Sequence, residues 1–278
     1  MYKILEKTQF SEKVFKFRIE APAIAKHAHA GQFLMVRANE TGERVPFTLA
    51  GWNGDEGWVE FIFMVIGKTT EMLSTYEAGE SLRDVVGPLG VPTEMAEGPC
   101  AVIGGGVGLA IAFPVAKHLV ETGHEVHAIM GARTKDLLLM EDQFRELLDE
   151  DHIHITTDDG SYGEQGVVTA PLERLLQDKA VSQVFCVGPV PMMKFSTLTA
   201  QKYDTPITAS LNPIMVDGTG MCGCCRVEVG VTKFACVDGP DFDATLVDWD
   251  DLRARQAAYR SEEGESLKAY EEKSCACH

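Results

Sequence analysis

The chain has 278 residues, of which 42 are acidic and 25 basic, for a formal net charge of −17. This charge repels phosphate backbones and anionic lipid surfaces, so we expect neither nucleic acid nor a membrane as a partner. Residues 1–13 hold no apolar segment of signal-peptide length, and nowhere is there an uninterrupted apolar run of about 18 residues. These features predict a soluble, cytoplasmic protein. Its length predicts two domains with a small appendage.

Residues 1–97 consist of short alternating or β-branched segments separated by glycine, asparagine and proline, which is typical of an antiparallel β-barrel. One segment carries a guanidinium that suits a diphosphate, an aromatic ring able to cover a flavin, and a hydroxyl able to bond to the flavin edge. These candidate cofactor-binding residues are Arg44, Pro46, Phe47 and Thr48. Phe47 is equally compatible with an ordinary place in the barrel core.

A second candidate phosphate-binding turn follows the apolar strand that ends near Val65. Gly67, Lys68, Thr69 and Thr70 open a predicted helix, whose first backbone N–H groups would face an anion. A simple capped helix start, with threonine at the cap, explains the same residues equally well.

Residues 98–210 alternate apolar strands with helices, which predicts a parallel, doubly wound sheet that binds a nucleotide. A glycine-rich loop joins the first strand to a helix, the context in which backbone amides bind a pyrophosphate. Its candidate residues are Gly104, Gly105, Gly106, Val107 and Gly108. The match to the dinucleotide fingerprint is incomplete, because Leu109 stands in place of the third glycine.

Two further loops follow predicted strands, where an open α/β sheet holds its ligand. One contains Arg133, which is suited to a ribose 2′-phosphate, to a diphosphate or only to solvent. The other contains Cys186, Gly188 and Pro189. Asp158 lies in a turn-forming Asp-Asp-Gly sequence, for which an ordinary turn is the first interpretation and a ribose contact the second.

Two other groups of residues have side chains that could bind a metal. His152 and His154 alternate along a predicted strand and share one face, but packing on that face is favoured because no acidic or cysteine partner is near in sequence. Cys275, Cys277 and His278 have metal-binding side chains, and an exposed chain end is the simpler expectation for them.

The most specific motif begins at Asp217 and continues with Cys222, Cys225 and Cys236. This is the plant-type [2Fe–2S] spacing with aspartate in place of the first cysteine. Two alternatives stay open at this point. Cys224 would complete four thiolates, although adjacent residues of an extended loop point in different directions. A zinc site is the other, although zinc sites normally pair two short cysteine spacings.

The sequence thus divides into a barrel (1–97), a nucleotide domain (98–210), a cluster subdomain (211–243) and a helical tail (244–278). The tail contains the segment DWDDLRARQAAYRSEE, which begins at Asp248 and reads as one amphipathic helix.

Together these motifs resemble the ferredoxin-NADP reductase superfamily, and in particular its branch with a C-terminal [2Fe–2S] subdomain. That branch includes the electron transfer subunit of dihydroorotate dehydrogenase and the small subunits of sulfide dehydrogenase and of NADH-dependent reduced ferredoxin:NADP oxidoreductase. Residues 217–223 and 236–240 are most similar to the last of these, which has aspartate at the first ligand position.

The resemblance implies FAD, a [2Fe–2S] cluster and NAD(H) as cofactors, with NADP(H) not excluded. Arg44 would hold the FAD diphosphate, Phe47 and Thr48 would lie beside the isoalloxazine, and residues 67–70 would cradle the phosphates. Residues 104–108, with Cys186 and Gly188, would shape the nicotinamide nucleotide site.

The resemblance also implies an electron-bifurcating complex. The partner would be a larger subunit with a second flavin and [4Fe–4S] clusters, similar to the glutamate synthase small subunit, and ferredoxin would act through that complex. Reduction of polysulfide and oxidation of dihydroorotate are the alternative reactions. The alternative outside enzymes is an iron–sulfur redox sensor.

Overall fold

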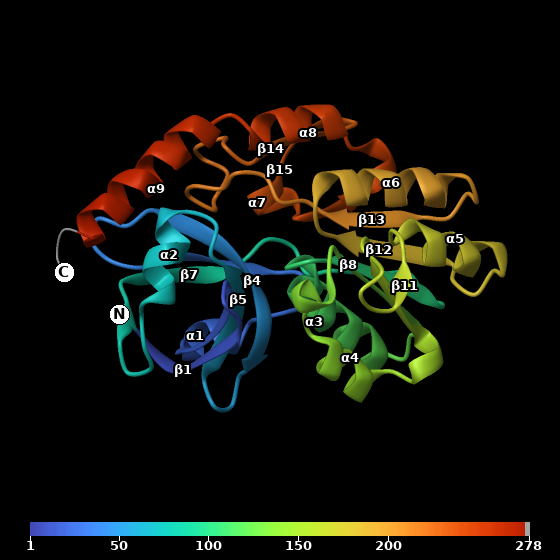
Figure 1. Cartoon of the computed structure of the whole chain (residues 1–278), viewed down its shortest axis with the longest axis horizontal. Helices are drawn as coiled ribbons and strands as arrows, with labels where there is room; N and C mark the ends of the chain where they lie inside the picture. Colours follow the sequence, from blue (N-terminus) through green and yellow to red (C-terminus); the bar gives the residue numbers. More distant parts are fainter. Residues whose placement is uncertain (276–278) are drawn as a thin grey trace.

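The structure is a computed structural model that describes residues 1–275, with side chains to residue 272. A β-barrel and an α/β domain lie side by side, and the C-terminal segment crosses over both (Figure 1). Within the described residues, no helix is long and apolar enough to span a membrane. The side chains of Cys275, Cys277 and His278, suggested above as metal ligands, lie outside this part.

The N-terminal strands form one antiparallel sheet in the order β6-β1-β2-β5-β4-β3-β7. Only Arg83 separates β6 from β7 in sequence, and its N–H donates to the carbonyl oxygens of Arg37 and Ala38, so the two edges meet. This confirms the predicted barrel, which is nearly closed. Its elements are β1 (Tyr2–Ser11), β2 (Val14–Glu20), α1 (Pro22–Ala25), β3 (Phe33–Arg37), β4 (Arg44–Asn53), β5 (Trp58–Met64), α2 (Lys68–Ser74), β6 (Ser81–Leu82) and β7 (Asp84–Leu89).

Aromatic side chains fill the barrel because inward positions alternate along each strand. Phe17 on β2 faces Phe61 on β5 in register, and both are fully buried. Phe63, two residues further along β5, packs edge-on against Phe17 at 5.1 Å between ring centroids. Burial of each such ring contributes about 1.5–3 kcal/mol to folding.

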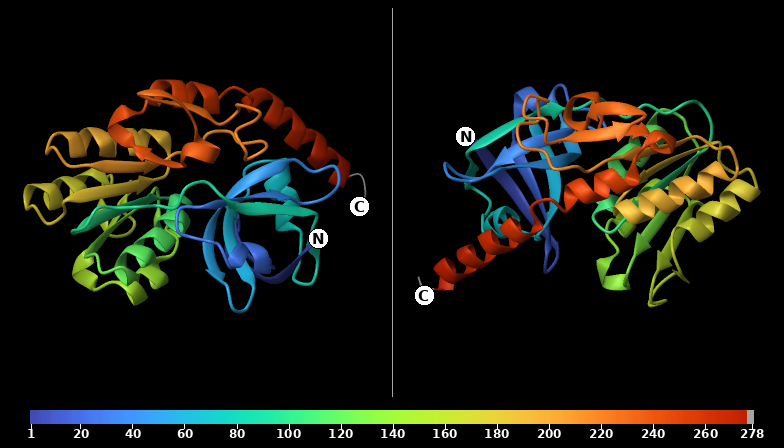
Figure 2. Two further views of the ribbon diagram at one scale, coloured as in Figure 1. Left: turned by 180° about the vertical axis from the view of Figure 1, so that it is seen from behind. Right: turned by 90° about the horizontal axis from the view of Figure 1, so that it is seen from above.

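The second sheet has the order β11-β10-β9-β8-β12-β13-β16 and is parallel except for β16. This confirms the doubly wound prediction. Helices α3 and α4 cover one face, and α5 and α6 cover the other (Figures 1 and 2). The elements are β8 (Cys100–Gly105), α3 (Gly108–Glu121), β9 (Val126–Ala132), η1 (Lys135–Leu137), α4 (Glu141–Leu147), η2 (Glu150–His152), β10 (Ile153–Thr157), β11 (Glu164–Gln165), α5 (Thr169–Gln177), β12 (Gln183–Val187), α6 (Val190–Gln201) and β13 (Ile207–Ser210).

This strand order fixes where a ligand can bind. Strand β8 is the first strand of this sheet in the sequence, and it lies between β9 and β12. The order in which strands are added to the sheet therefore reverses at β8. In open α/β sheets the crevice at such a switch point, outside the carboxyl ends of the strands, is the ligand site. The crevice here faces the barrel, since α3 packs against β4.

The cysteine-rich segment is built into the same sheet. It comprises β14 (Arg226–Val229), β15 (Val231–Phe234), α7 (Ala235–Asp238), β16 (Asp241–Asp243) and η3 (Ala244–Leu246). Phe242 on β16 pairs with Ala209 on β13, and Cys225 and Cys236 belong to the core cluster that α5 and α6 also bury. The predicted boundary at residue 211 therefore stays a prediction, because the segments on its two sides share one core.

The tail forms two helices, so the prediction of one is wrong. In α8 (Trp249–Gln256), the Asp248 carboxylate caps the first turn and Trp249 and Leu252 are buried. In α9 (Arg260–Cys275), the chain crosses to the barrel and contacts α2 (Figure 2). Helix α8 packs against α6 and β14, whereas α9 contacts α2 of the barrel, and the chain bends between the two helices.

Candidate functional site

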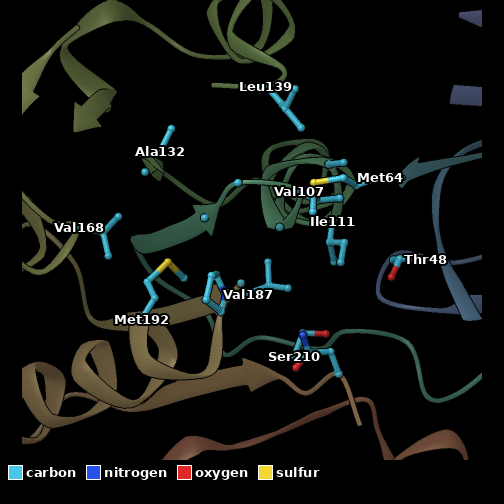
Figure 3. A pocket seen from close by; sticks show the side chains of 18 of the residues that line it. Thr48, Met64, Val107, Ile111, Ala132, Leu139, Val168, Val187, Met192 and Ser210 are labelled. Atoms are coloured by element: carbon cyan, nitrogen blue, oxygen red, sulfur yellow. The ribbon is translucent and has the colours of Figure 1, made fainter. Parts of the chain in front are cut away.

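A cavity of about 1380 Å³ lies between the barrel and the carboxyl ends of the parallel strands. Pockets for a single ligand are typically about 300–1000 Å³, so this one has room for more than one. Thr48 faces it from the barrel, and Val107, Val187 and Met192 face it from the α/β domain (Figure 3). The predicted residues that line it are Pro46, Phe47, Thr48, Thr70, Gly105, Gly106, Val107, Gly108, Arg133, Asp158, Gly188 and Pro189.

On the barrel side, β4 supplies most of the wall. Phe47 is only 9% exposed and stacks on Phe61 at 4.9 Å with an interplanar angle of 7°, so it is a core residue whose edge reaches the cavity. Arg44, at the first position of the strand, is exposed and does not line the cavity. It forms no salt bridge within the described residues, which leaves its guanidinium available to an anion.

The turn before α2 is a capped helix start. The Thr70 hydroxyl accepts from the backbone N–H groups of Ile66 and Gly67 and donates to the Gly67 carbonyl oxygen. Lys68 and Thr69 both contact the Glu43 carboxylate, at 3.6 and 3.0 Å. A Cβ at Gly67 would meet open space, so the N-terminus of the helix is accessible. Val65, Gly67, Lys68 and Thr69 lie outside the cavity lining.

The glycine loop between β8 and α3 divides into packed and open positions. A Cβ at Gly104 would come within 2.9 Å of the Leu109 Cα, and one at Gly108 would strike the Val187 carbonyl oxygen. Gly106 has a φ of +57° and open space where its Cβ would lie. Close packing therefore explains Gly104 and Gly108, whereas Gly106 leaves room for a ligand at the α3 N-terminus.

The far end of the cavity is bounded by the loops after β9 and β10. Arg133 and Asp158 are both exposed there and offer opposite charges to a ligand. The two loops are tied together, because the Asp158 N–H donates to the Ala132 carbonyl oxygen at 3.1 Å.

Cys186 does not line the cavity, and its place in the nucleotide site stays a prediction. Its thiol is fully buried inside β12, and burial raises its pKa. Successive strand residues point to opposite faces, so the next residue, Val187, reaches the cavity instead.

Sequence reasoning missed several other lining residues. Met192 lies in the first turn of α6, and Ser210 ends β13. Pro240, just before β16, also lines the cavity, as do Leu211 and Asn212. The rule that ligands bind beyond the carboxyl ends of parallel strands would have identified Ser210. The Pro240 contact depends on tertiary packing alone.

The cysteine loop adjoins this cavity. The Asp217 carboxylate accepts from the backbone N–H groups of Thr219 and Cys222, both at 2.8 Å, and these bonds lower its pKa. The Sγ atoms of Cys225 and Cys236 are 3.1 Å apart and buried.

The loop fits a binuclear cluster better than a single zinc ion. Gly218, Gly220 and Gly223 all have positive φ, which folds the backbone around the ligand side chains. A zinc site would gather four donors around one point. Within the described residues, the one group of three potential ligands that lie mutually within 4.8 Å is elsewhere, at Glu125, His127 and His152. Cys224 is partly exposed beside Cys222.

The two predicted histidines lie away from the cofactor cavity, at the amino ends of β9 and β10. His154 is on β10, but His152 ends the η2 turn before it. Both adjoin His127 on β9, and burial lowers the pKa of His127 and of His154. The acidic partner that is absent from the local sequence is Glu125, which immediately precedes the neighbouring strand β9.

Comparison with known proteins agrees with this architecture. Residues 102–197 match the oxidoreductase NAD-binding domain, and residues 212–248 match the iron-sulfur cluster binding domain of dihydroorotate dehydrogenase B. An Amycolatopsis cytochrome P450 reductase shares the fold at 21% identity, with a TM-score of 0.59 over 73% of this chain and 65% of that one.

Nearer relatives match almost the whole chain. A Thermotoga maritima protein named as a homologue of the dihydroorotate dehydrogenase B (NAD(+)) electron transfer subunit is 47% identical over 96% of this chain and 94% of its own. The electron transfer subunit from Desulforamulus reducens is 32% identical over 89% of this chain and 97% of its own.

A solved structure of NADH-dependent reduced ferredoxin-NADP oxidoreductase, described for flavin-based electron bifurcation, contains a chain that is 46% identical, with a TM-score of 0.89. The match covers 97% of this chain and 98% of that one. The chain therefore belongs to the family of dihydroorotate dehydrogenase B electron transfer subunits and their homologues, within the ferredoxin-NADP reductase superfamily.

Proposed function

We propose that this electron-transfer subunit belongs to an electron-bifurcating NADH-dependent reduced ferredoxin:NADP oxidoreductase. One observation carries the electron-transfer part of the proposal: the nucleotide cavity and the cluster loop are contiguous. Pro240 lines the cavity, and Gly218, which follows the proposed ligand Asp217, packs on Met35 and Leu89 of the barrel. Electrons leaving a flavin in the cavity would thus have a short route to the cluster.

In the chain, Pro240 follows the proposed ligand Cys236 by four positions, so the segment that holds one end of the cluster also forms part of the cavity wall. The Pro240 carbonyl oxygen accepts from the Leu211 N–H at 2.9 Å, which fixes this segment against the end of β13.

The cofactors of this fold are FAD, a [2Fe–2S] cluster and NAD(H). Bound FAD supplies the exchange between two-electron hydride chemistry and the one-electron chemistry of the cluster. The chain's own task is to hold these groups in order and to exclude water, for which the apolar cavity wall is suited.

For FAD, we assign the diphosphate to Arg44 and the α2 N-terminus, and the isoalloxazine to the cavity face of β4. The free guanidinium of Arg44 and the open space at Gly67 support the first assignment. The place of Thr48 on the cavity wall supports the second. Phe47 would support the ring through its edge, because its face is already stacked on Phe61.

For NAD(H), we assign the pyrophosphate to the loop at Gly106 and the α3 N-terminus. The nicotinamide would lie toward Gly188 and Pro189, nearer the barrel, and the adenosine ribose toward Arg133 and Asp158. Asp158 favours a ribose 2′-hydroxyl, whereas Arg133 favours a 2′-phosphate, so the pair bears on the choice between NAD(H) and NADP(H).

For the cluster, we assign Asp217, Cys222, Cys225 and Cys236 as ligands. Within this loop Met221 is 90% exposed, and Val237, which follows Cys236, is 48% exposed. Such exposed apolar side chains next to an electron exit are suited to a docking surface. The family's subunits work in complexes with a larger partner. We propose that here it bears a flavin and [4Fe–4S] clusters and receives electrons from reduced ferredoxin.

The test is to copurify the chain with its partner and to measure NADP reduction. We expect NADPH to form only when both NADH and reduced ferredoxin are present. Dihydroorotate-dependent reduction of NAD, or NADH-dependent reduction of polysulfide without ferredoxin, would instead identify one of the other two reactions. A stable, fully active monomer without a flavoprotein partner would also contradict the proposal. A redox sensor would show no bleaching of a flavin band by NADH.

A further inference from the structure

A cluster of metal-ligating side chains lies at the end of the α/β sheet that is remote from the cofactors. Glu125 immediately precedes β9, His127 is the second residue of that strand, and His152 immediately precedes β10. Strand β9 has seven residues, which places this cluster roughly 20 Å from the cofactor crevice at the other end of the sheet. It therefore belongs to no site described above.

The three side chains face a common point. The Glu125 Oε1 atom is 3.6 Å from the Nε2 atom of His127 and 3.6 Å from the Nε2 atom of His152. All three donor atoms lie within 4.8 Å of one another. These N···O distances exceed those of ordinary hydrogen bonds, at about 2.7–3.2 Å. They are close to the spacing of about 3.3 Å between two ligands of a tetrahedral zinc ion with bonds of about 2.0–2.1 Å.

A neighbouring histidine orients the most buried ligand. The Nδ1 atom of His127 lies 3.4 Å from the Nε2 atom of His154, and the two rings stack with an interplanar angle of 21°. If Nδ1 of His127 carries the proton and donates to His154, the lone pair of its Nε2 atom faces Glu125. Metal-binding histidines ordinarily use their second ring nitrogen in this way.

The site also has room for a further ligand. A cavity of about 340 Å³ is lined by Glu125 and His152. His124 lines it too, but its ring nitrogens contact the carbonyl oxygens of Leu119 and Ala96 at 3.2 and 3.0 Å, so it is already engaged. Water can therefore take the fourth position.

We propose that Glu125, His127 and His152 bind a divalent transition-metal ion of the Zn²⁺ class, with water as fourth ligand. Two imidazoles and one carboxylate form a ligand set that zinc accepts. The ion would join the start of β9 to the start of β10. Because the ion would bind the folded chain and not the unfolded one, it would stabilise the amino ends of these two strands.

The test uses the full-length protein with flavin and cluster in place. Cys275→Ser, Cys277→Ser and His278→Ala are introduced first, so that the chain end does not compete for metal. The protein is dialysed against micromolar ZnCl₂ and gel-filtered, and zinc and iron are counted in the same sample. We expect one zinc per chain with the cluster iron unchanged.

Glu125→Gln and His152→Ala should each weaken zinc binding at least about tenfold, the lower end of the effect of altering even an outer-shell residue. Glu146→Gln and His124→Ala, in the same cavity, are the matched controls and should bind zinc as the parent does. Equal binding by all four variants, or no zinc at all, would overturn the proposal.

A zinc-edge anomalous difference map provides a readout that does not depend on how well the variants fold. A peak at bonding distance from the three donor atoms supports the site. A peak only at the cysteine loop overturns it.

Discussion

At Asp217, which we propose as a cluster ligand, the chain has a carboxylate where the plant-type [2Fe–2S] loop has a cysteine. The carboxylate is held by the backbone N–H groups of Thr219 and Cys222, and these bonds keep it ionised by lowering its pKa. A carboxylate is a harder donor than a thiolate, so as a ligand it would change the electron density at its iron.

Asp217→Cys should therefore keep the cluster but shift its midpoint potential, as measured by a redox titration monitored by EPR. Cys224→Ser is the matched control, and we expect it to leave both the spectrum and the potential unchanged. An unchanged potential in Asp217→Cys, together with loss of the cluster in Cys224→Ser, would identify Cys224 as the ligand.

Gly106 and Gly123 make a matched pair at the two ends of α3. Both have positive φ, +57° and +91°, and neither would place a Cβ within 4 Å of another atom. Alanine at either position should cost about 1–2 kcal/mol of stability through backbone strain. Gly106→Ala alone should also raise the KM for NADH, because its Cβ would project at the proposed pyrophosphate site. Steady-state kinetics and thermal unfolding of both variants check this, and an equal KM in both would contradict the assignment.

At the scale of single elements, β16 joins the cluster segment to the sheet and carries a half-buried acid, Asp241. Asp241 starts this strand, and the Thr93 hydroxyl donates to its Oδ2 atom. Its Oδ1 atom finds no donor among the described residues. Burial raises the pKa of Asp241 to about 6, so the folded chain favours the protonated form.

Because this pKa is raised on folding, the native state binds more protons than the unfolded state between about pH 4 and 6. Stability should therefore fall as the pH rises from about 4 to about 6, by on the order of 2–3 kcal/mol in total from this group. Asp241→Asn, which cannot ionise, should unfold with a smaller loss of stability between pH 5 and pH 7.5 than the parent chain. Parallel pH profiles of the two melting temperatures would contradict this.

The helices show where local pattern was enough and where it was not. The helix after the glycine loop is predictable because its apolar residues and flanking glycines form a local pattern. The burial of those apolar residues agrees with that pattern. The tail was misassigned as one helix, since nothing near Ala257 signals a break. The buried Trp249 holds α8 against the α/β domain, while α9 contacts the barrel. This long-range packing overrides local helix propensity.

At the scale of the whole molecule, α9 connects α8 to the barrel. It contacts α2, whose first turn we assign to the FAD diphosphate (Figure 1). No residue of α9 belongs to the three core clusters of the described chain, so the rest should fold without it.

A chain that ends at Gln256 should keep its fold but bind FAD roughly tenfold more weakly, equivalent to about 1.4 kcal/mol. Circular dichroism and FAD titration would measure the two effects. A chain that ends at Lys273 is the control and should bind FAD normally. Unchanged FAD affinity in the shorter chain would show that α9 does not support the α2 turn.

The sequence by itself determined the classes of structure and chemistry. Alternating strands, glycine loops and cysteine spacing are local patterns, and they predict the barrel and the doubly wound sheet and, through the family resemblance that they carry, the cofactors. Tertiary structure decided which side chains meet. It brought Pro240 to the cavity wall and placed Glu125 beside His152. Strand pairing and burial join residues that are distant in the chain, and such contacts leave no periodic signal in sequence.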